Sequence, residues 1–217
     1  MSSAPSVRRP LKTRDATWAR ALARWLAQRR VSPNRISLLS LAFAVLGAGA
    51  MLLVPFAEPA ARITLLVLAA VSIQLRLLCN LLDGMVAVEG GLGSRVGEVY
   101  NDLPDRLADP LLIVPAGYAT GLAWGPELAW LAGCLALLTA YIRLLGGTCG
   151  LPQDFRGPMA KPHRMATMTL GLLIAALAAP FGWDGWILIL ALLMVAAGAA
   201  WTAARRVHVI LDALESR

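Results

Sequence analysis

Four amide and carboxylate side chains form a regular pattern in the stretch from Asn80 to Asp109. Asn80 and Asp83 lie three residues apart near the end of one apolar run, and Asn101 and Asp105 lie four apart at the start of the next. If both runs are helical, each pair shares one face, so the four side chains can converge between two helix ends. Oxygen ligands of this kind favour a hard cation such as Mg²⁺, shared with substrate phosphates.

The same stretch lies between long apolar runs, where ionisable side chains are costly and therefore indicate a functional site. Its central part is rich in glycine, which suits a turn and a close backbone approach to a ligand. These glycines are Gly84, Gly90, Gly91, Gly93 and Gly97. The alternative is a purely structural polar network that holds two helices together, as asparagine often does at helix interfaces.

The residues NLLDGMVAVEGGLGSRVGEVYNDLPD resemble the signature of the CDP-alcohol phosphatidyltransferase family, D-x-x-D-G-x-x-A-R-x8-G-x3-D-x3-D. The positions that match in register are Asp83, Gly84, Ala87, Gly97 and Asp105. The positions that depart are Asn80 and Asn101 in place of aspartates and Val88 in place of the arginine. The chain is thus similar to a divergent member of this family.

The resemblance implies displacement of CMP from a CDP-linked donor by an acceptor alcohol, assisted by one or two Mg²⁺ or Mn²⁺ ions. It makes Asp83 the first metal ligand and Asp105 the general base and a further ligand. Asn80 and Asn101 would coordinate through their amide oxygens. Because the quartet carries two negative charges instead of four, we expect weaker metal binding or a single ion. Gly84, Ala87 and Gly97 match the small positions against which the nucleotide packs.

Three basic residues are candidates for binding a substrate phosphate. Arg143 lies inside the apolar end of one run, whereas Lys161 and Arg164 lie in a basic stretch before another. For Arg143 the alternative is snorkelling of its charged group to the membrane interface. For Lys161 and Arg164 the alternative is a topology signal that contacts lipid headgroups, and the sequence favours neither interpretation.

The composition indicates one membrane domain. The chain has 217 residues, of which 58% are hydrophobic, and its mean hydropathy of +0.65 is too high for an ordinary soluble domain. The net charge of +7 comes from Lys and Arg that flank apolar runs, which predicts contact with anionic lipids and excludes a nucleic-acid partner. The three cysteines show no metal-ligand spacing and are expected to be buried thiols.

The elements that must position the polar stretch are helices, so the predicted class is an all-α integral membrane protein. We expect an amphipathic interfacial helix, capped by Thr13 or Asp15 and ending near Arg30, after a disordered start. Six runs of spanning length follow, although charges crowd the third. They are Ile36–Phe56, Ile63–Leu82, Val99–Leu122, Leu128–Leu145, Met165–Phe181 and Trp186–Ala203.

Three segments follow from this layout: a basic tail with the interfacial helix at 1–31, a transmembrane domain at 32–204, and a short cytoplasmic C-terminal helix at 205–217. Basic residues precede the first run, separate the fourth from the fifth and follow the last. By the positive-inside rule, both termini and the polar stretch face the cytoplasm across the cytoplasmic (inner) membrane.

The interpretation we favour is a membrane transferase of phospholipid biosynthesis. It would move a phosphatidyl or related phospho-alcohol group from a CDP-linked lipid such as CDP-diacylglycerol to an alcohol. The resemblance also implies a homodimer. Two alternatives are an inactive family member that binds lipid or a partner, and a small transporter. A transporter predicts a polar path through the membrane, whereas the polar groups here gather near one face.

Overall fold

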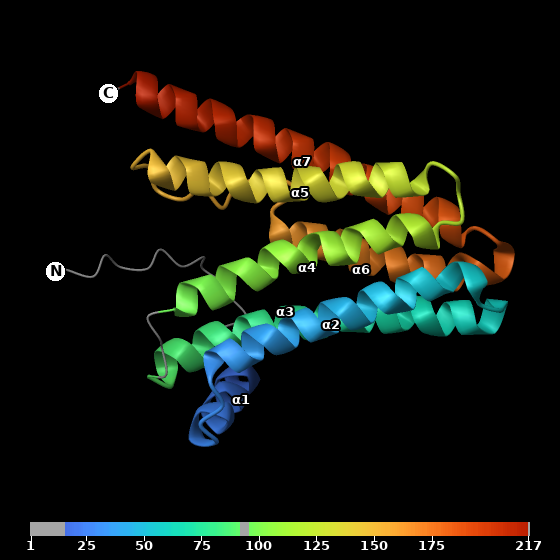
Figure 1. Cartoon of the computed structure of the whole chain (residues 1–217), viewed down its shortest axis with the longest axis horizontal. Coiled ribbons are helices and arrows are strands. Elements are labelled where there is room, and N and C mark those ends of the chain that lie inside the picture. The colour runs from blue at the N-terminus through green and yellow to red at the C-terminus, as the bar shows by residue number, and fades with distance from the viewer. Residues whose placement is uncertain (1–15, 92–95, 217) are drawn as a thin grey trace.

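The computed structural model describes residues 16–91 and 96–216, apart from the side chains of Glu89, Glu98 and Asn101. Every regular element within those ranges is helical (Figure 1). In chain order they are α1 (Thr17–Gln28), α2 (Pro33–Leu53), η2 (Val54–Phe56), α3 (Pro59–Glu89), α4 (Gly97–Ala119), α5 (Gly125–Thr148), α6 (Lys161–Ala178), η3 (Ala179–Phe181) and α7 (Asp184–Glu215). The predicted all-α class is confirmed.

The long helices run up and down beside one another. Helix α2 packs on α3 and α4, α5 packs on α4 and α7, and α6 packs on α3 and α7. Figure 1 shows the C-terminal ends of α3, α5 and α7 and the N-terminal ends of α2 and α4 toward the same end of the bundle as α1, whereas α6 begins nearer the middle. We call the end with α1 the site end. The α2–α3, α4–α5 and α6–α7 connections lie at the opposite end.

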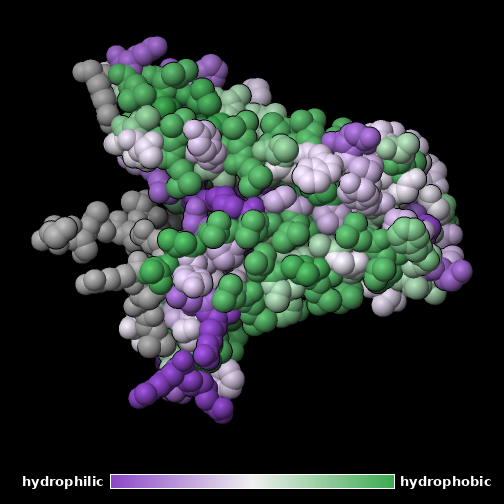
Figure 2. Space-filling view, viewed as in Figure 1, coloured by the Kyte–Doolittle hydropathy of each residue, from purple (hydrophilic) through white to green (hydrophobic). Residues whose placement is uncertain are grey.

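Five of these helical segments are long and apolar enough to cross a membrane, so the chain is an integral membrane protein. They are Pro33–Phe56, Pro59–Val88, Gly125–Thr148, Lys161–Phe181 and Asp184–Glu215. Helix α4 is not among them because Asp102, Asp105, Arg106 and Asp109 occupy its first half. The predicted count of six spans therefore stays a prediction. Apolar side chains cover much of the visible middle of the bundle (Figure 2).

Small residues bring the helices close together. Ala129, Ala132 and Ala136 on α5 are fully buried, and a Cβ added at Gly117 of α4 would lie 2.5 Å from the carbonyl oxygen of Gly125. Without a hydrophobic force between helices in lipid, such close backbone contact is what packs them. The bundle is therefore held by contacts that larger side chains would prevent.

Helix α1 packs on α3 through Ala19 and Ala23 and leaves Trp18 and Trp25 about half exposed. This arrangement fits the predicted amphipathic helix, whose suggested caps Thr13 and Asp15 lie outside the described residues, as does the predicted disordered start. Residues expected as a separate C-terminal helix are instead the last turns of α7, which is continuous to Glu215.

Helix α3 extends further than the apolar run that predicted it. The run was expected to end at Leu82, whereas the helix continues to Glu89. Met85 and Val86 are buried in the cluster that also holds Ala19 and Ala23 of α1, so packing against α1 extends the helix. Asp83 and Gly84 consequently lie inside a helix and not at the start of a glycine-rich turn.

Candidate active site

The two halves of the polar pattern meet at the site end, where α3 and α4 lie against each other. Asn80 on α3 donates a hydrogen bond from Nδ2 to Oδ1 of Asp105 on α4, at 2.7 Å. Asp83 lies one turn beyond Asn80 and interacts electrostatically with Asp105. The convergence expected from helical spacing is thus present for these three side chains.

The carboxylate of Asp83 is held from two sides. Ser37 of α2 donates from Oγ to Oδ2 at 2.7 Å, and the backbone N–H of Gly84 donates to Oδ1 at 2.6 Å. The residue is only 3% exposed. Hydrogen bonds to a buried carboxylate compensate for its lost hydration and fix its orientation. Each oxygen retains a lone pair, so Asp83 can still bind a cation.

Asp105 is surrounded by cations. Lys161, the first residue of α6, forms an ion pair with Oδ2, and Arg76 of α3 donates from Nη2 to Oδ1 at 3.1 Å. Together with the Asn80 amide, three donors share the two oxygens of this carboxylate. These contacts fix the position of the Asp105 carboxylate between α3, α4 and α6.

One turn further into α4, Asp109 forms a second, fully enclosed ion cluster. Arg76 donates to its Oδ1 at 3.1 Å, and Arg164 of α6 pairs with its Oδ2. Arg164 also donates to the hydroxyl of Thr139 on α5, at 3.4 Å. Arg76, Asp109 and Arg164 are at most 2% exposed, and a buried charge persists only when it is paired. The cluster links α3, α4, α5 and α6 beneath the site.

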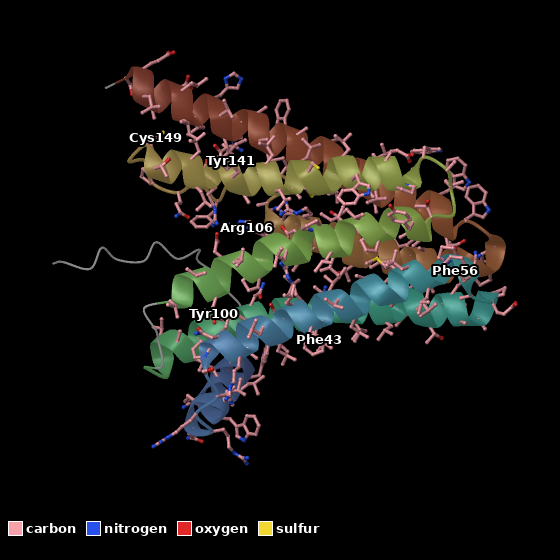
Figure 3. All side chains as sticks on the ribbon, in the orientation of Figure 1. Phe43, Phe56, Tyr100, Arg106, Tyr141 and Cys149 are labelled. Carbon is pink, nitrogen blue, oxygen red and sulfur yellow. The ribbon has the colours of Figure 1, made fainter. Side chains whose placement is uncertain are left out.

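Asp102 connects α4 to α5. It accepts hydrogen bonds from Nη2 of Arg106 at 2.8 and 2.9 Å, and from Nη2 of Arg143 at 3.1 Å. Figure 3 shows Arg106 between the two helices. The guanidinium carbon of Arg143 also lies 5.0 Å from the ring centroid of Phe155. Arg143 is thus paired and stacked, and does not simply reach for the interface.

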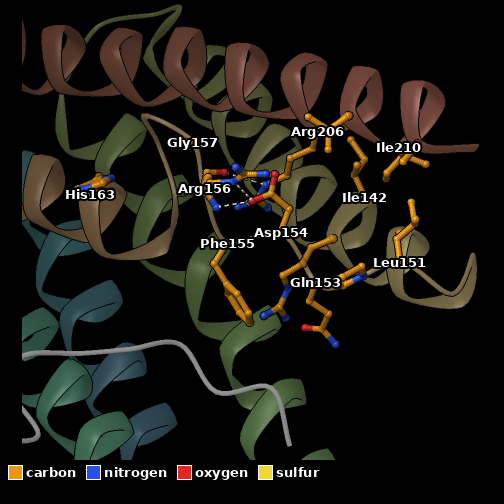
Figure 4. A pocket seen from close by; sticks show the side chains of 15 residues that line it. Ile142, Leu151, Gln153, Asp154, Phe155, Arg156, Gly157, His163, Arg206 and Ile210 are labelled. Carbon is orange, nitrogen blue, oxygen red and sulfur yellow. Dashed lines mark hydrogen bonds and ion pairs between the residues drawn. The ribbon is translucent and has the colours of Figure 1, made fainter. Parts of the chain in front are cut away.

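A pocket of about 760 Å³ opens beside this link, between α5, α7 and the segment 149–160 (Figure 4). Arg143, Arg156 and Arg206 contribute positive charge to its lining, and Phe155 contributes an aromatic ring. Burial alone would raise the pKa of Asp154 in the same lining, but hydrogen bonds from the Arg156 side chain and backbone N–H hold that pKa below its usual range. The pocket therefore suits an anionic ligand.

The oxygen donors fit one divalent cation better than two. Asp83 offers a carboxylate with one neutral donor on each oxygen, and Asn80 offers an amide oxygen, whereas Asp105 is already paired with two cationic side chains, Arg76 and Lys161. Among the described residues, no group of three His, Cys, Asp or Glu side chains is arranged to hold a metal ion. A single ion at Asp83 and Asn80 is compatible with the geometry, with Asp105 joining only when Lys161 moves away.

The remaining predicted residues lie at the same end of the bundle. Gly84 and Ala87 follow Asp83 on α3, and Gly97 begins α4, all of them partly exposed. Val88, at the position of the family arginine, is exposed. The side chain of Asn101 lies outside the described residues. The three phosphate candidates lie in different places: Arg143 lines the pocket and pairs with Asp102, whereas Lys161 and Arg164 pair with Asp105 and Asp109 outside the pocket lining.

Sequence reasoning gave too little weight to Arg76, Asp109 and Ser37. Arg76 lies four residues before Asn80, and Asp109 lies four after Asp105, so extending the two helical faces by one turn would have paired them. Ser37 is different, because it comes from α2, 46 residues from the carboxylate it contacts. No spacing rule within one helix finds such a contact.

Comparisons with known proteins show which sequences and structures the chain is similar to. A sequence model of the CDP-alcohol phosphatidyltransferase family matches residues 30–199. Inner membrane protein YnbA of Escherichia coli K12 is 28% identical over 193 residues, covering 86% of this chain and 88% of that protein. The phosphatidylinositol phosphate synthase of Mycolicibacterium smegmatis is 29% identical over 199 residues, covering 88% and 83%.

Solved structures share the fold. The Mycobacterium tuberculosis phosphatidylinositol phosphate synthase with CDP-DAG bound superposes with a TM-score of 0.72 at 21% identity, covering 90% of this chain and 94% of that one. A second structure of that enzyme, in complex with manganese and citrate, gives a TM-score of 0.73 at 21% identity, with 89% and 88% covered. At this level of identity the likeness establishes the fold.

Proposed function

The chain belongs to the CDP-alcohol phosphatidyltransferase family, and from that premise we propose that it transfers a phosphatidyl group from CDP-diacylglycerol to an acceptor alcohol. The acceptor oxygen would form a bond to the lipid-linked phosphorus as the bond to CMP breaks. The observation that carries this proposal is the meeting of the motif residues Asn80, Asp83 and Asp105 at one end of α3 and α4.

We assign Asp105 as the general base that takes the proton of the acceptor hydroxyl. Its ion pairs with Lys161 and Arg76 hold the carboxylate in place at the site end, and a general base must be positioned within reach of the proton that it takes. Gly84, Ala87 and Gly97 would leave space for the nucleotide, because they present little or no side chain on the exposed part of the site end.

Asp83 is the proposed first ligand of a divalent cation, with Asn80 and Asn101 contributing amide oxygens. Ser37 and the Gly84 N–H hold the Asp83 carboxylate in place for that role. A bound Mg²⁺ or Mn²⁺ ion would offset the negative charge of the diphosphate and the departing CMP. The family uses such ions, and we propose one ion for this chain.

The arginine-lined pocket is the proposed acceptor site. Arg143 lines it and pairs with Asp102, which lies three residues before Asp105 on α4, so the pocket adjoins the base. Because Arg143, Arg156 and Arg206 all contribute to the lining, we propose an acceptor alcohol that carries an anionic group such as a phosphate. Lys161 and Arg164 are less suited to acceptor binding, because they pair with Asp105 and Asp109 and do not belong to the lining of this pocket.

We place the site end on the cytoplasmic side of the inner membrane. Hydrophilic side chains gather around α1 at that end (Figure 2), where Arg29 and Arg30 are exposed. At the opposite end Trp124 and Trp186 lie with their ring centroids 6.5 Å apart, as residues of an interfacial aromatic belt. Both described chain ends, at α1 and at the end of α7, would then face the cytoplasm. The proposal also includes a basic interfacial segment at 1–31, a transmembrane domain that starts at residue 32, a sixth span through α4, and a homodimer.

The test is CMP release by the purified protein in liposomes. CDP-diacylglycerol is the donor, the acceptors are alcohols with and without a phosphate, and each reaction runs with Mg²⁺, Mn²⁺ or chelator. We expect metal-dependent release that is largest with a phosphorylated acceptor and is lost in Asp105→Ala. The matched control is Asp212→Ala, which removes an exposed carboxylate of α7 and should leave release unchanged.

Two outcomes would contradict the proposal. Binding of the CDP-lipid without CMP release would mean that the protein is a family member that binds lipid but has lost transferase activity, with Asn80 and Asn101 as the sequence sign of that loss. If neither binding nor release is detected, only the fold assignment remains. Equal release with phosphorylated and plain acceptors would contradict the acceptor assignment alone.

A further inference from the structure

Positive charge is already present where the proposed metal ion would bind. Among the described residues of the buried site, Asp83, Asp105 and Asp109 supply three negative charges, and Arg76, Lys161 and Arg164 supply three positive ones. The centre is therefore electrically balanced without a metal ion. A divalent cation would add two charges that only an incoming anion could offset.

Lys161 is placed to compete with a cation for Asp105. Its ammonium pairs with Oδ2 of Asp105 and also interacts electrostatically with Asp83. Its side chain is 25% exposed, whereas Arg76 and Arg164 are at most 2% exposed. A flexible lysine with access to solvent can leave such a pair, but an enclosed arginine cannot.

The position of Lys161 in its own helix does not explain its presence. It is the first residue of α6, whose first turn contains no acidic residue. The partial positive charge of a helix N-terminus disfavours cations there, so Asp105 is the group that stabilises Lys161 at this position.

Arg76, the enclosed arginine that also pairs with Asp105, gives a second reason to expect competition with a cation at this centre. Arg76 donates from Nη2 to Asp105 and Asp109, while its buried Nε and Nη1 have no hydrogen-bond partner among the residues that the structure describes. Buried guanidinium N–H groups require an acceptor, so these two are suited to an oxygen of an incoming anion or water. The centre thus offers donors for an anion and few unoccupied oxygens for a cation.

We propose that Lys161 is a built-in counter-ion that occupies the cation position at Asp105, so that a divalent ion binds there only when the Lys161–Asp105 pair opens. Lys161 therefore sets the metal affinity of this two-asparagine centre. The inference rests on the metal site of the proposed function but not on transfer, because it concerns binding in the absence of lipid.

The experiment measures Mn²⁺ binding to the purified protein in detergent by electron paramagnetic resonance of the free ion. Removing a positive charge next to a divalent cation should lower the Kd of Lys161→Met at least about tenfold below that of the native protein. Arg205→Met, which removes an exposed cation from α7 at the same end, should keep the native Kd. Gel filtration and thermal unfolding check that each variant folds.

Lys161→Gln provides a second variant, because its amide can still donate to Asp105 while carrying no charge. It should also bind Mn²⁺ more tightly than the native protein. Equal Kd values in the native protein and both Lys161 variants, or weaker binding in the folded variants, would overturn the inference. If the Lys161 variants bind Mn²⁺ more tightly but the native protein releases no CMP, the inference stands and only the transferase proposal is contradicted.

Discussion

At the scale of single residues, the site depends on hydrogen bonds that orient carboxylates. Asp83 and Asp105 belong to the motif, but some of the groups that hold them come from helices outside it: Ser37 from α2 and Lys161 from α6. The chemistry proposed for a motif carboxylate therefore depends on residues outside the motif. Two substitutions test the surroundings of these carboxylates. One changes Ser37, which contacts the proposed metal ligand, and the other changes Asp109, which lies one turn after the proposed base on α4.

Ser37→Ala removes the hydroxyl that donates to Asp83 and should lower the rate of CMP release about tenfold or more. A hydrogen bond to a charged group contributes about 1.5–3 kcal/mol, and 1.4 kcal/mol corresponds to tenfold. Ser40→Ala is the matched control, because that buried hydroxyl donates only to the Ser37 carbonyl oxygen, at 2.6 Å. Equal rates for the two variants would show that Ser37 does not position Asp83.

Asp109→Ala should lower the free energy of unfolding by about 3–5 kcal/mol, because it leaves Arg76 and Arg164 buried without their shared anion. The comparison is Asp154→Ala, which breaks the pair with the exposed Arg156 and should cost less than about 1 kcal/mol. Unfolding in detergent, followed by intrinsic tryptophan fluorescence, gives both values. Similar losses in the two variants would mean that the Asp109 cluster is not a structural centre.

At the scale of helices, close contact between backbones determines where the functional side chains meet. Helix α4 carries Asp102, Asp105 and Asp109 on successive turns, and it contacts α2 and α5 along its length. Three prolines, Pro104, Pro110 and Pro115, lie inside this helix, and packing against neighbours is what allows a membrane helix to retain them. Positioning of the site therefore depends on the α4–α5 contact at the opposite end as well.

Gly117→Ala should destabilise the protein, because the added Cβ would lie 2.5 Å from the Gly125 carbonyl oxygen and closer still to the Ala129 Cβ. The expected loss is about 1–3 kcal/mol, the usual cost of overpacking. Gly49→Ala is the matched control in α2, where an added Cβ meets nothing within 4 Å. That change should be neutral or stabilising, since alanine favours helix over glycine. Thermal unfolding that ranks the two variants in the opposite order would contradict the packing.

At the scale of the whole molecule, the bundle has two chemically different ends. The site end carries the ion clusters, the pocket and α1, and the other end carries Trp124, Trp183 and Trp186, all well exposed. This asymmetry underlies the proposed orientation. It also gives a test that uses the three natural cysteines, none of which is in a disulfide.

The expectation of three buried thiols was wrong for two of them, because only Cys79 is buried. Cys134 is exposed on the spanning part of α5, and Cys149, which follows the last residue of α5 at the site end, is partly exposed. A membrane-impermeant maleimide should therefore modify Cys149 in inside-out vesicles and not in right-side-out ones. Cys149→Ser should abolish the label, which assigns it to that residue. Labelling in right-side-out vesicles would place the site end outside and overturn the orientation.

The sequence alone determined the class of fold and the centre of the site. Apolar runs near the length of a bilayer predicted the long helices, because a backbone in lipid must satisfy its hydrogen bonds internally. The i to i+3 and i to i+4 spacings predicted that Asn80, Asp83 and Asp105 converge, because helical geometry fixes which side chains share a face. The count of six spans depends on α4, because the charged residues of that helix interrupt the apolar run that would identify it as a span.

Only the tertiary structure decided which groups complete the site. Lys161 and Arg164 were candidates for substrate phosphate, yet in the fold they pair with Asp105 and Asp109, 56 and 55 residues away. Ser37 reaches Asp83 from another helix in the same way. Within one helix, spacing determines which residues are neighbours, but the partner of a charged group on another helix depends on how the helices pack. The charge balance around the motif therefore emerges only when α2, α3, α4 and α6 are brought together.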